Sequence, residues 1–212
     1  MVTIAVIDYD MGNLHSACKG LEHAGAIATV TDSHHEMQQA DAVILPGVGA
    51  FDPAIQHLRS RDLIQPIKDI IASGKPFLGI CLGLQILLDG SEEGKEPGLG
   101  VIPGMVRRFQ PEPDIAIPHM GWNQLNFVQP DLSVWQGLSA DPWVYFVHSF
   151  YADPRLESDK AAMVTHGSQT VTAAIARDNL VAVQFHPEKS STTGLQILTN
   201  FVASVRQPVY SR

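Results

Sequence analysis

The chain has 212 residues, 45% of them hydrophobic, and its 22 acidic side chains outweigh 14 basic ones to give a formal net charge of −8. This length and composition are typical of one globular domain whose core is large enough to fold without disulfides, so we expect a single domain over residues 1–212. The acidic balance and the lack of a basic cluster argue against nucleic acid as a partner.

The two cysteines, Cys18 and Cys81, lie in unrelated contexts and are too few for a disulfide framework. No group of cysteines and histidines has the spacing of metal ligands, so we expect neither a metal nor a cofactor. The first residues lack the basic segment and longer apolar stretch of a secretory signal, and no apolar run is long enough to cross a membrane. We therefore expect a cytoplasmic protein.

The first part of the chain alternates predicted strands and helices. Apolar runs predict buried strands at residues 3–7, 27–31, 42–45 and 77–80. Helical stretches are predicted between and after them, at 14–24, within 32–39, at about 52–72 and at 82–88. Asn13 caps the first helix and Gly25 stops it. This alternation implies an α/β fold with parallel strands, whose site is expected at the carboxyl ends of the strands.

The rest of the chain predicts shorter strands and a mixed or antiparallel part of the sheet. A glycine- and glutamate-rich surface loop is expected at 91–100. Strand candidates follow at residues 101–109, 122–127, 144–147 and 161–165. Residues 171–176 and 180–185 predict a hairpin, and the apolar spacing of 191–205 predicts a closing helix.

Cys81 stands where the strand at 77–80 meets the next helix, with Gly79 and Gly83 on either side. This is the cysteine version of the G-x-S-x-G nucleophile elbow, in which a strained turn needs neighbours that lack a Cβ. The following helix dipole favours a thiolate, and the N–H of Leu82 points to where an oxyanion would form. The alternative is a small buried cysteine of the core.

His186 and Glu188 follow the predicted strand at 180–185, with Pro187 between them. Because Pro187 favours extended backbone before it, the two side chains are expected on the same side of the chain. A carboxylate in that position orients the imidazole and favours its protonated form. Taken alone, His186 has a structural role as its alternative. Together with Cys81 it predicts acyl transfer through a thioester.

The loop at Gly47, Val48 and Gly49 ends the strand at 42–45. An N–H of Val48 or Gly49 would complete an oxyanion hole with the N–H of Leu82, because the glycines permit unusual backbone orientations. A simple strand-to-helix turn is the alternative, and a phosphate cradle is disfavoured because no Gly-Lys-Ser/Thr continuation follows. By spacing alone, His119 and His148 are interpreted as satisfied or partner-facing histidines.

Residues 46–49 (PGVG), 79–85 (GICLGLQ) and 186–188 (HPE) together resemble the class I, or triad, glutamine amidotransferases. Within that class the chain is similar to the glutaminase subunits of imidazole glycerol phosphate synthase. The stretches that carry this narrower resemblance are 8–13 (DYDMGN), 118–123 (PHMGWN), 145–150 (YFVHSF) and 186–190 (HPEKS). The resemblance covers nearly the whole chain and implies a flavodoxin-like three-layer fold.

The resemblance assigns roles to matching positions. It implies Cys81 as nucleophile, His186 as base and Glu188 as its orienter. It implies a glutamine site at Gly47, Gly49, Gln85, His148, Ser149 and Phe150. It places a partner interface at Asn13, Trp122, Tyr145 and Lys189. The partner would be a (β/α)₈-barrel cyclase that forms a heterodimer with the chain, receives ammonia, and produces imidazole glycerol phosphate and aminoimidazole carboxamide ribotide.

Two positions depart from the family pattern, which usually has glycine at Asp10 and often tyrosine at Phe150. Other functions remain open from the sequence. One is the glutaminase of another pathway, such as vitamin B6, anthranilate or GMP synthesis. A second is a catalytically idle regulatory subunit on the same fold. A third is a cysteine peptidase or small-peptide hydrolase.

Overall fold

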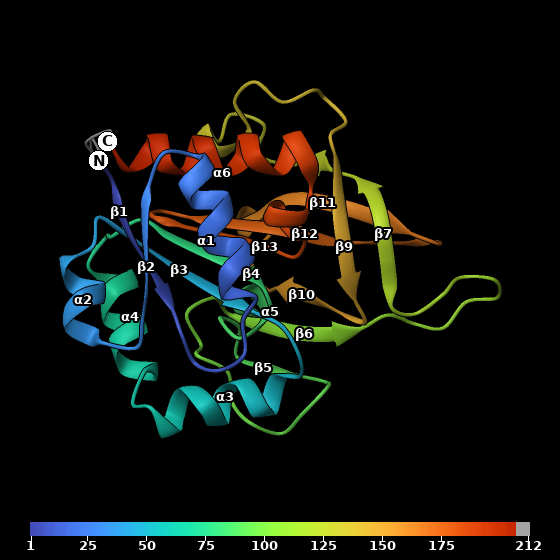
Figure 1. The fold of residues 1–212 in the computed structure, drawn as a ribbon. Helices are drawn as coiled ribbons and strands as arrows, with labels where there is room; N and C mark the ends of the chain where they lie inside the picture. Colours follow the sequence, from blue (N-terminus) through green and yellow to red (C-terminus); the bar gives the residue numbers. More distant parts are fainter. Residues whose placement is uncertain (207–212) are drawn as a thin grey trace.

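The computed structural model of the protein describes residues 1–206. Its centre is an eleven-stranded sheet whose main path runs β2-β1-β3-β4-β13-β12-β10-β6-β5 (Figure 1). The first five strands of this path are parallel to one another. They are β2 (Ile27–Thr31), β1 (Thr3–Ile7), β3 (Ala42–Gly47), β4 (Phe77–Cys81) and β13 (Leu180–Val183). Parallel pairing brings the carboxyl ends of these strands to one edge of the sheet.

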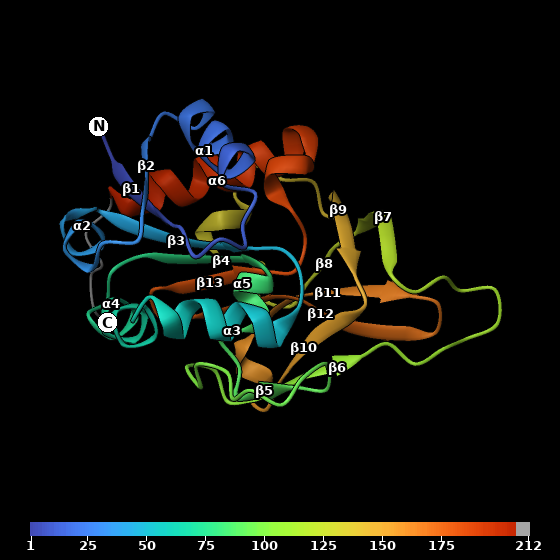
Figure 2. The same ribbon diagram turned by 60° about the horizontal axis from the view of Figure 1, so that its bottom comes forward.

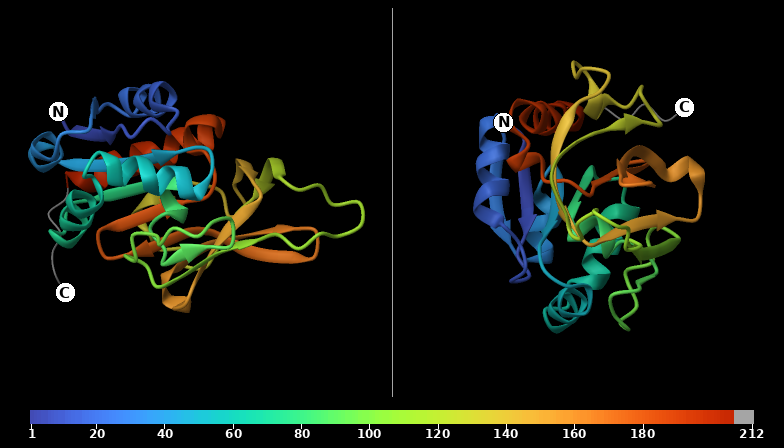
Figure 3. Two further views of the ribbon diagram at one scale, coloured as in Figure 1. Left: turned by 90° about the horizontal axis from the view of Figure 1, so that it is seen from below. Right: turned by 90° about the vertical axis from the view of Figure 1, so that its right-hand side faces the viewer.

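Beyond β13 the pairing becomes antiparallel, except that β5 and β6 are parallel. This part contains β12 (Gln169–Arg177), β10 (Phe150–Pro154), β6 (Gly104–Arg108) and β5 (Gly90–Ser91), with β11 (Lys160–His166) and β8 (Asn126–Phe127) attached. A separate antiparallel ribbon pairs β7 (His119–Gln124) with β9 (Trp143–His148). The ribbon and the long segment between β6 and β7 lie at one end of the molecule (Figure 3).

Helices cover both faces of the parallel part, which gives three layers (Figures 1 and 2). One face carries α1 (Leu14–His23) and α6 (Ser191–Val205); the other carries α2 (His34–Gln39), α3 (Phe51–Ser60) and α4 (Ile64–Ala72). The one-turn helix α5 (Leu82–Gln85) follows β4. Three 3₁₀ turns are η1 (Ser133–Trp135), η2 (Glu157–Asp159) and η3 (Pro187–Lys189). Across residues 1–206, no helix combines the length and apolarity needed to cross a membrane.

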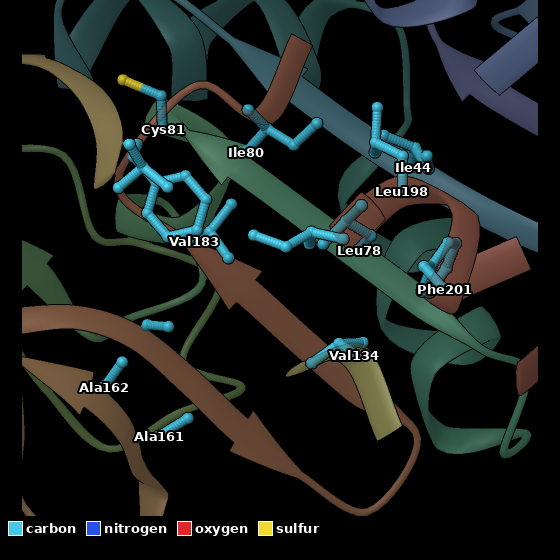
Figure 4. Close-up of a cluster of buried hydrophobic side chains, with 14 of the residues drawn as sticks. Ile44, Leu78, Ile80, Cys81, Val134, Ala161, Ala162, Val183, Leu198 and Phe201 are labelled. Carbon is cyan, nitrogen blue, oxygen red and sulfur yellow. The ribbon is translucent and has the colours of Figure 1, made fainter. Parts of the chain in front are cut away.

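The core divides into two clusters because side chains alternate between the two faces of each buried strand. Ile44, Leu78 and Ile80 belong to the cluster under α6, where they join Leu198 and Phe201 (Figure 4). Their neighbours along β3 and β4 point to the opposite cluster, under α3 and α4. Cys81 is the last residue of this apolar row on β4 (Figure 4). Packing on both faces therefore fixes the strand that presents the cysteine.

The four predicted N-terminal strands, the closing helix and the hairpin of β12 with β13 are confirmed. Asn13 caps α1 as expected, with its Oδ1 accepting a hydrogen bond from the N–H of Ser16 at 3.4 Å. The strand expected at 101–109 begins only at Gly104, and the one expected at 122–127 is divided into β7 and β8, with β7 already starting at His119. Strand β10 has no counterpart in the sequence prediction.

Two predicted helices were wrong in extent. The stretch at 52–72 is two helices, because the chain turns at Asp62, whose φ is +55°. The helix expected at 82–88 ends at Gln85. Its continuation does not form because the carbonyls of Ile86, Leu87 and Leu88 accept hydrogen bonds from residues 99–102 instead. The segment at 98–102 therefore pairs with the end of the elbow helix.

The departure at Asp10 has a conformational explanation. Asp10 has φ of +67°, in the left-handed region that glycine adopts freely and aspartate tolerates. Its carboxylate pairs with Arg61 Nη2 at 2.6 Å, at the turn between α3 and α4. The aspartate therefore keeps the turn after β1 and adds a surface ion pair to it.

Candidate active site

Cys81 has the backbone of a nucleophile elbow, with φ of +55° and ψ of −108°. A non-glycine residue in this region is strained, and the surrounding structure must hold it there. Gly83 is required for this close approach, since a Cβ built on it would collide with the Leu45 carbonyl oxygen. Because α5 is only one turn long, its dipole is small.

His186 and Glu188 form a buried pair, with Nδ1 of the imidazole 2.7 Å from Oε1 of the carboxylate. His186 has the extended backbone expected before Pro187, with φ of −101° and ψ of 96°, but the extended stretch does not continue to Glu188, because Pro187 to Lys189 form η3. The turn still brings the two side chains together, and both are at most 3% exposed. Glu188 therefore fixes the imidazole as an Nδ1–H donor, which turns its Nε2 to the other side.

The site raises the pKa of the His186 imidazole. Burial lowers the pKa of its imidazole, but interactions with Cys81 and Glu188 outweigh burial and raise that pKa from 6.5 to about 9. Its Nε2 is buried and has no hydrogen-bond partner among residues 1–206. Hydrogen bonds between catalytic groups are often long or absent in a free enzyme and form when substrate binds.

A cavity of about 320 Å³ opens beside this pair. Cys81, Leu82 and His186 line it, and so do Val48 and Gly49 of the loop after β3. Four of the residues that the resemblance assigns to glutamine also line it, namely Gln85, His148, Ser149 and Phe150. Gly47 lies outside this cavity, in a smaller hollow that reaches from Asn13 to the His186–Glu188 pair.

Glu93 also lines the cavity, although no sequence pattern singles it out. It lies in the segment expected to be only a surface loop. Its Oε2 accepts a hydrogen bond from the N–H of Phe51 at 2.9 Å. In return, the Asp52 carboxylate accepts hydrogen bonds from the N–H groups of Lys95 and Glu96. We call this reciprocal set the Asp52–Glu93 clip. It joins the start of α3 to residues 93–96 and holds a carboxylate at the cavity.

The loop of Gly47, Val48 and Gly49 lies as expected at the carboxyl end of β3, next to Cys81. The N–H of Val48 donates to the Met11 carbonyl at 2.9 Å. In this conformation, therefore, the Val48 N–H has a partner other than an oxyanion, and it would have to turn to enter the site. Gly49 has φ of +104°, and a Cβ on Gly47 would collide with the Tyr9 hydroxyl.

His148 and His119 form a directed hydrogen-bond chain that begins at the Phe150 carbonyl. A carbonyl can only accept, so Nδ1 of His148 donates to it at 2.9 Å, and Nε2 of His148 then accepts from Nδ1 of His119 at 2.9 Å. Nε2 of His119 accepts in turn from Asn123 at 3.1 Å. Burial lowers the pKa of His148 to about 3 and that of His119 to about 4. Both rings are therefore neutral, each in one fixed tautomer.

The four residues assigned to a partner lie on neighbouring elements. Trp122 and Tyr145 face each other across the β7–β9 ribbon with ring centroids 6.1 Å apart, and Trp122 is 48% exposed. The backbone of Tyr145 bonds to Ser190 Oγ and to the N–H of His186. Lys189 is exposed on η3, and Asn13 is occupied in capping α1. The ribbon is thus hydrogen-bonded directly to the turn that carries the histidine.

Residues 1–206 contain no group of three histidine, cysteine, aspartate or glutamate side chains arranged to hold a metal ion. The polar side chains that line the cavity include the thiol of Cys81, the imidazole of His186 and the carboxylate of Glu93.

Comparison with known proteins agrees with this geometry. The family model described as "Glutamine amidotransferase class-I" matches residues 5–205. Two relatives described as imidazole glycerol phosphate synthase subunit HisH come from Acaryochloris marina and Nostoc punctiforme. The first is 71% identical over 97% of this chain and 96% of its own. The second is 69% identical over 99% of both chains.

Solved structures share the fold at low identity. A structure of PurLQS from Thermotoga maritima has a TM-score of 0.75 and 17% identity, covering 97% of this chain and 99% of its own. The glutaminase domain of CTPS from Trypanosoma brucei has a TM-score of 0.70 and 17% identity over 97% of this chain and 94% of its own. The chain belongs to the class-I glutamine amidotransferases and, within them, to the family of the HisH subunits of imidazole glycerol phosphate synthase.

Proposed function

We propose that Cys81, His186 and Glu188 hydrolyse L-glutamine to glutamate and ammonia in the 320 Å³ cavity. As a HisH-family member the chain is the glutaminase subunit of imidazole glycerol phosphate synthase, an enzyme of histidine biosynthesis. The observation that carries the residue assignment is the buried His186–Glu188 pair, 2.7 Å apart, beside a cysteine on a strained elbow.

The pKa of His186, raised to about 9, keeps its imidazole protonated at neutral pH and so favours a thiolate on Cys81. The thiolate attacks the side-chain amide carbon of glutamine, and the amide oxygen becomes an oxyanion. His186 gives its proton to the leaving nitrogen, which departs as ammonia and leaves a thioester. The neutral imidazole then takes a proton from water, whose oxygen attacks the thioester and releases glutamate.

Charge and hydrogen-bond capacity support an amino-acid substrate. The Glu93 carboxylate at the cavity suits the α-ammonium group of glutamine. Both amide hydrogens of Gln85 are already used, one on the Phe150 carbonyl at 2.9 Å and one on Gln184 Oε1 at 3.0 Å. Gln85 therefore offers its amide oxygen to the cavity, where it can accept from an N–H of the substrate. Backbone groups of Ser149 and Phe150 complete the proposed contacts.

The oxyanion would be held by the N–H of Leu82 with one from Val48 or Gly49. Because Val48 donates to Met11 in the isolated chain, we infer that the chain alone is a weak glutaminase and that its partner turns this peptide. The proposed partner is a (β/α)₈-barrel cyclase that forms a heterodimer through Asn13, Trp122, Tyr145 and Lys189. A sheltered path is needed because free ammonia is protonated near neutral pH and is then no longer a nucleophile.

We infer that residues 1–212 act as one glutaminase domain, which is supported by the family match over 5–205. The test is glutamate release by the wild type and by Cys81→Ala, each with and without a barrel cyclase and its ribotide ligand. We expect release that rises with the cyclase and vanishes in Cys81→Ala. Equal rates with and without the cyclase would contradict the partner dependence, and full activity in Cys81→Ala would contradict the nucleophile.

A further inference from the structure

Gln184 lies beside the nucleophile because of strand register. Strands β13 and β4 are parallel, with Val183 opposite Ile80, so Gln184, the first residue after β13, follows beside Cys81, the last residue of β4. The backbone of Gln184 is fixed by a hydrogen bond from its N–H to the Ala173 carbonyl at 2.8 Å. Its side chain then reaches the cysteine, with Nε2 3.7 Å from Sγ. That distance is within hydrogen-bond range for a sulfur acceptor.

The side chain of Gln184 is fully buried, with an exposed fraction of 0%. Burying an amide is unfavourable unless both of its ends have partners. Its two partners here are the Cys81 sulfur and the amide nitrogen of Gln85. One of them is the proposed nucleophile and the other lines the proposed glutamine cavity. An apolar side chain would fill the same position without this requirement, so the amide group itself has a use there.

The orientation of the Gln184 amide follows from a backbone carbonyl. The Phe150 carbonyl can only accept, so the group of Gln85 that faces it at 2.9 Å is the nitrogen. That nitrogen also lies 3.0 Å from Gln184, which must present its oxygen to it. The nitrogen of Gln184 is then the end that faces Cys81. Rotating this amide by half a turn would place two N–H donors against each other, so the chain of bonds determines a donor toward the sulfur.

A neutral donor next to the sulfur has two effects on a thiolate. It stabilises the negative charge, because hydrogen bonds to charged groups are stronger than those between neutral groups. It also restricts the direction in which the sulfur points, which keeps it aimed at the cavity. His186 can supply charge but has to move its proton to the leaving group during the reaction. The Gln184 amide does not transfer a proton during the reaction, so its N–H remains available as a donor at every step.

We propose that Gln184 is a positioning residue for the Cys81 thiolate, held in its orientation by Gln85 and the Phe150 carbonyl. This inference rests on the proposed function, since it assigns Gln184 a role in the same glutaminase site. It adds a fixed, uncharged donor to the Cys–His–Glu set. The same hydrogen-bond chain makes the sulfur and the wall of the substrate cavity parts of one structure.

Two variants test the donor. Gln184→Met keeps the length of the side chain and cannot donate, whereas Gln184→Glu keeps an acceptor for Gln85 and loses the donor to the sulfur. For both we expect the pH profile of Cys81 alkylation by iodoacetamide to shift to higher pH, and kcat of the cyclase-activated glutaminase to fall roughly 10- to 100-fold. KM for glutamine should change by less than about threefold, because Gln85 and Phe150 still bond to each other.

The matched control is Asn200→Leu, which removes another buried amide, one on α6 that bonds to the carbonyls of Val134 and Gln136. It should lower the melting temperature and leave the alkylation profile unchanged. A wild-type alkylation profile and kcat in Gln184→Met would overturn the proposal, as would an equal profile shift in Asn200→Leu.

A measurement on the unsubstituted side chain covers the case in which both Gln184 variants fail to fold. The side-chain amide signal of Gln184 in an NMR spectrum should follow pH in step with Cys81 alkylation in the wild type, and should not do so in Cys81→Ala. A signal that does not respond to pH in the wild type would overturn the proposal. Absence of glutamate release by the wild type with its cyclase would contradict the proposed function instead, while alkylation would still report on Gln184.

Discussion

Two sides of Cys81 differ in how their polar groups are bonded. On the base side, which comprises His186, Glu188 and Gln184, the amide of Gln184 bonds to the sulfur, and His186 bonds to Glu188. On the other, the loop side, the N–H of Val48 is bonded to Met11 and turned to a different partner. The difference is that the groups proposed as base, orienting carboxylate and sulfur donor are already packed around Cys81 in the chain alone. The group that would stabilise the oxyanion is not.

This difference separates two requirements of the reaction. A thiolate needs a nearby positive charge or hydrogen-bond donors, and His186 and Gln184, which follow β13, can supply them. Stabilising an oxyanion needs a hydrogen-bond donor placed where the negative charge develops. In the proposed site this donor depends on the orientation of the Val48 peptide, which lies between Gly47 and Gly49. A loop peptide can turn without disturbing packed strands, so this is the requirement that a partner can control.

The largest effect is expected from breaking the base side. Glu188→Gln keeps the shape of the side chain but removes the negative charge from Nδ1 of His186. The pKa of His186 should fall from about 9, and kcat of the activated enzyme should drop by about 10³–10⁴, as for comparable orienting carboxylates. Steady-state glutaminase assays would measure it. A loss smaller than tenfold would show that the pair does not need its carboxylate.

The loop side can be weakened separately through Glu93. Glu93→Gln removes the charge opposite the proposed α-ammonium group but keeps an oxygen for the N–H of Phe51. KM for glutamine should rise roughly 10- to 100-fold while kcat changes little, since a charged hydrogen bond is replaced by a neutral one. Glu96→Gln, on the same loop and paired with Arg59, is the control and should leave KM unchanged. A fall in kcat alone would place Glu93 in the chemical step.

Acid should affect the histidine chain behind the cavity. Folding lowers the pKa values of His148 and His119 to about 3 and about 4. At a pH between these values and 6.5, the two histidines are therefore protonated in the unfolded chain and neutral in the folded chain. Their contribution to stability is complete above about pH 6.5 and is lost as pH falls toward 3–4. When pH falls from 6.5 to 5, each of the two rings should lower the free energy of unfolding by about 1.6 kcal/mol, which urea titration would measure.

The control for the acid effect compares two single variants. His119→Gln should roughly halve the pH dependence of unfolding between pH 6.5 and 5, because His148 remains, whereas His35→Gln, at an exposed position on α2, should leave it as in the wild type. If both variants gave the wild-type slope, the acid sensitivity would have another source.

The smallest effect concerns Tyr9, which lies against Gly47 on the loop side. Its hydroxyl is buried, and among residues 1–206 it has no hydrogen-bond partner. Burial also raises the pKa of this phenol well above its usual range, so it remains neutral. Tyr9→Phe should therefore stabilise the chain by about 1 kcal/mol, with unchanged basal glutaminase. Chemical denaturation would measure this, and a loss of stability would mean that the hydroxyl is satisfied in solution.

The sequence allowed prediction of those features that depend on local pattern. Apolar runs and turn residues located the parallel strands, and glycines around Cys81 located the elbow. His186 and Glu188 are two residues apart, so they remain in contact although the chain turns into η3 after His186. The fold class followed from the same alternation of strands and helices.

The remaining features depend on contacts between distant parts of the chain. Gln184 meets Cys81 only because Val183 is in register with Ile80. Glu93 reaches the cavity only because Asp52 fastens residues 95–96 to the start of α3. The N–H of Val48 bonds to Met11, which is distant in the sequence, so no local residue pattern encodes its direction. The helix predicted at 82–88 was too long, because the backbone at 98–102 that bonds to its last residues is distant in the sequence and is not part of the local pattern.

The Asp52–Glu93 clip makes the proposed substrate an effector of the loop side. Phe51, which holds Glu93, is only two residues beyond Gly49, so a turn of the loop is transmitted along the backbone to the carboxylate that faces the cavity. If glutamine binds more tightly when the loop is turned, then bound glutamine stabilises the turned loop by the same free energy, as thermodynamic linkage requires. Glutamine and a partner that turns the loop would then act on one shared equilibrium, and each would increase the affinity of the chain for the other.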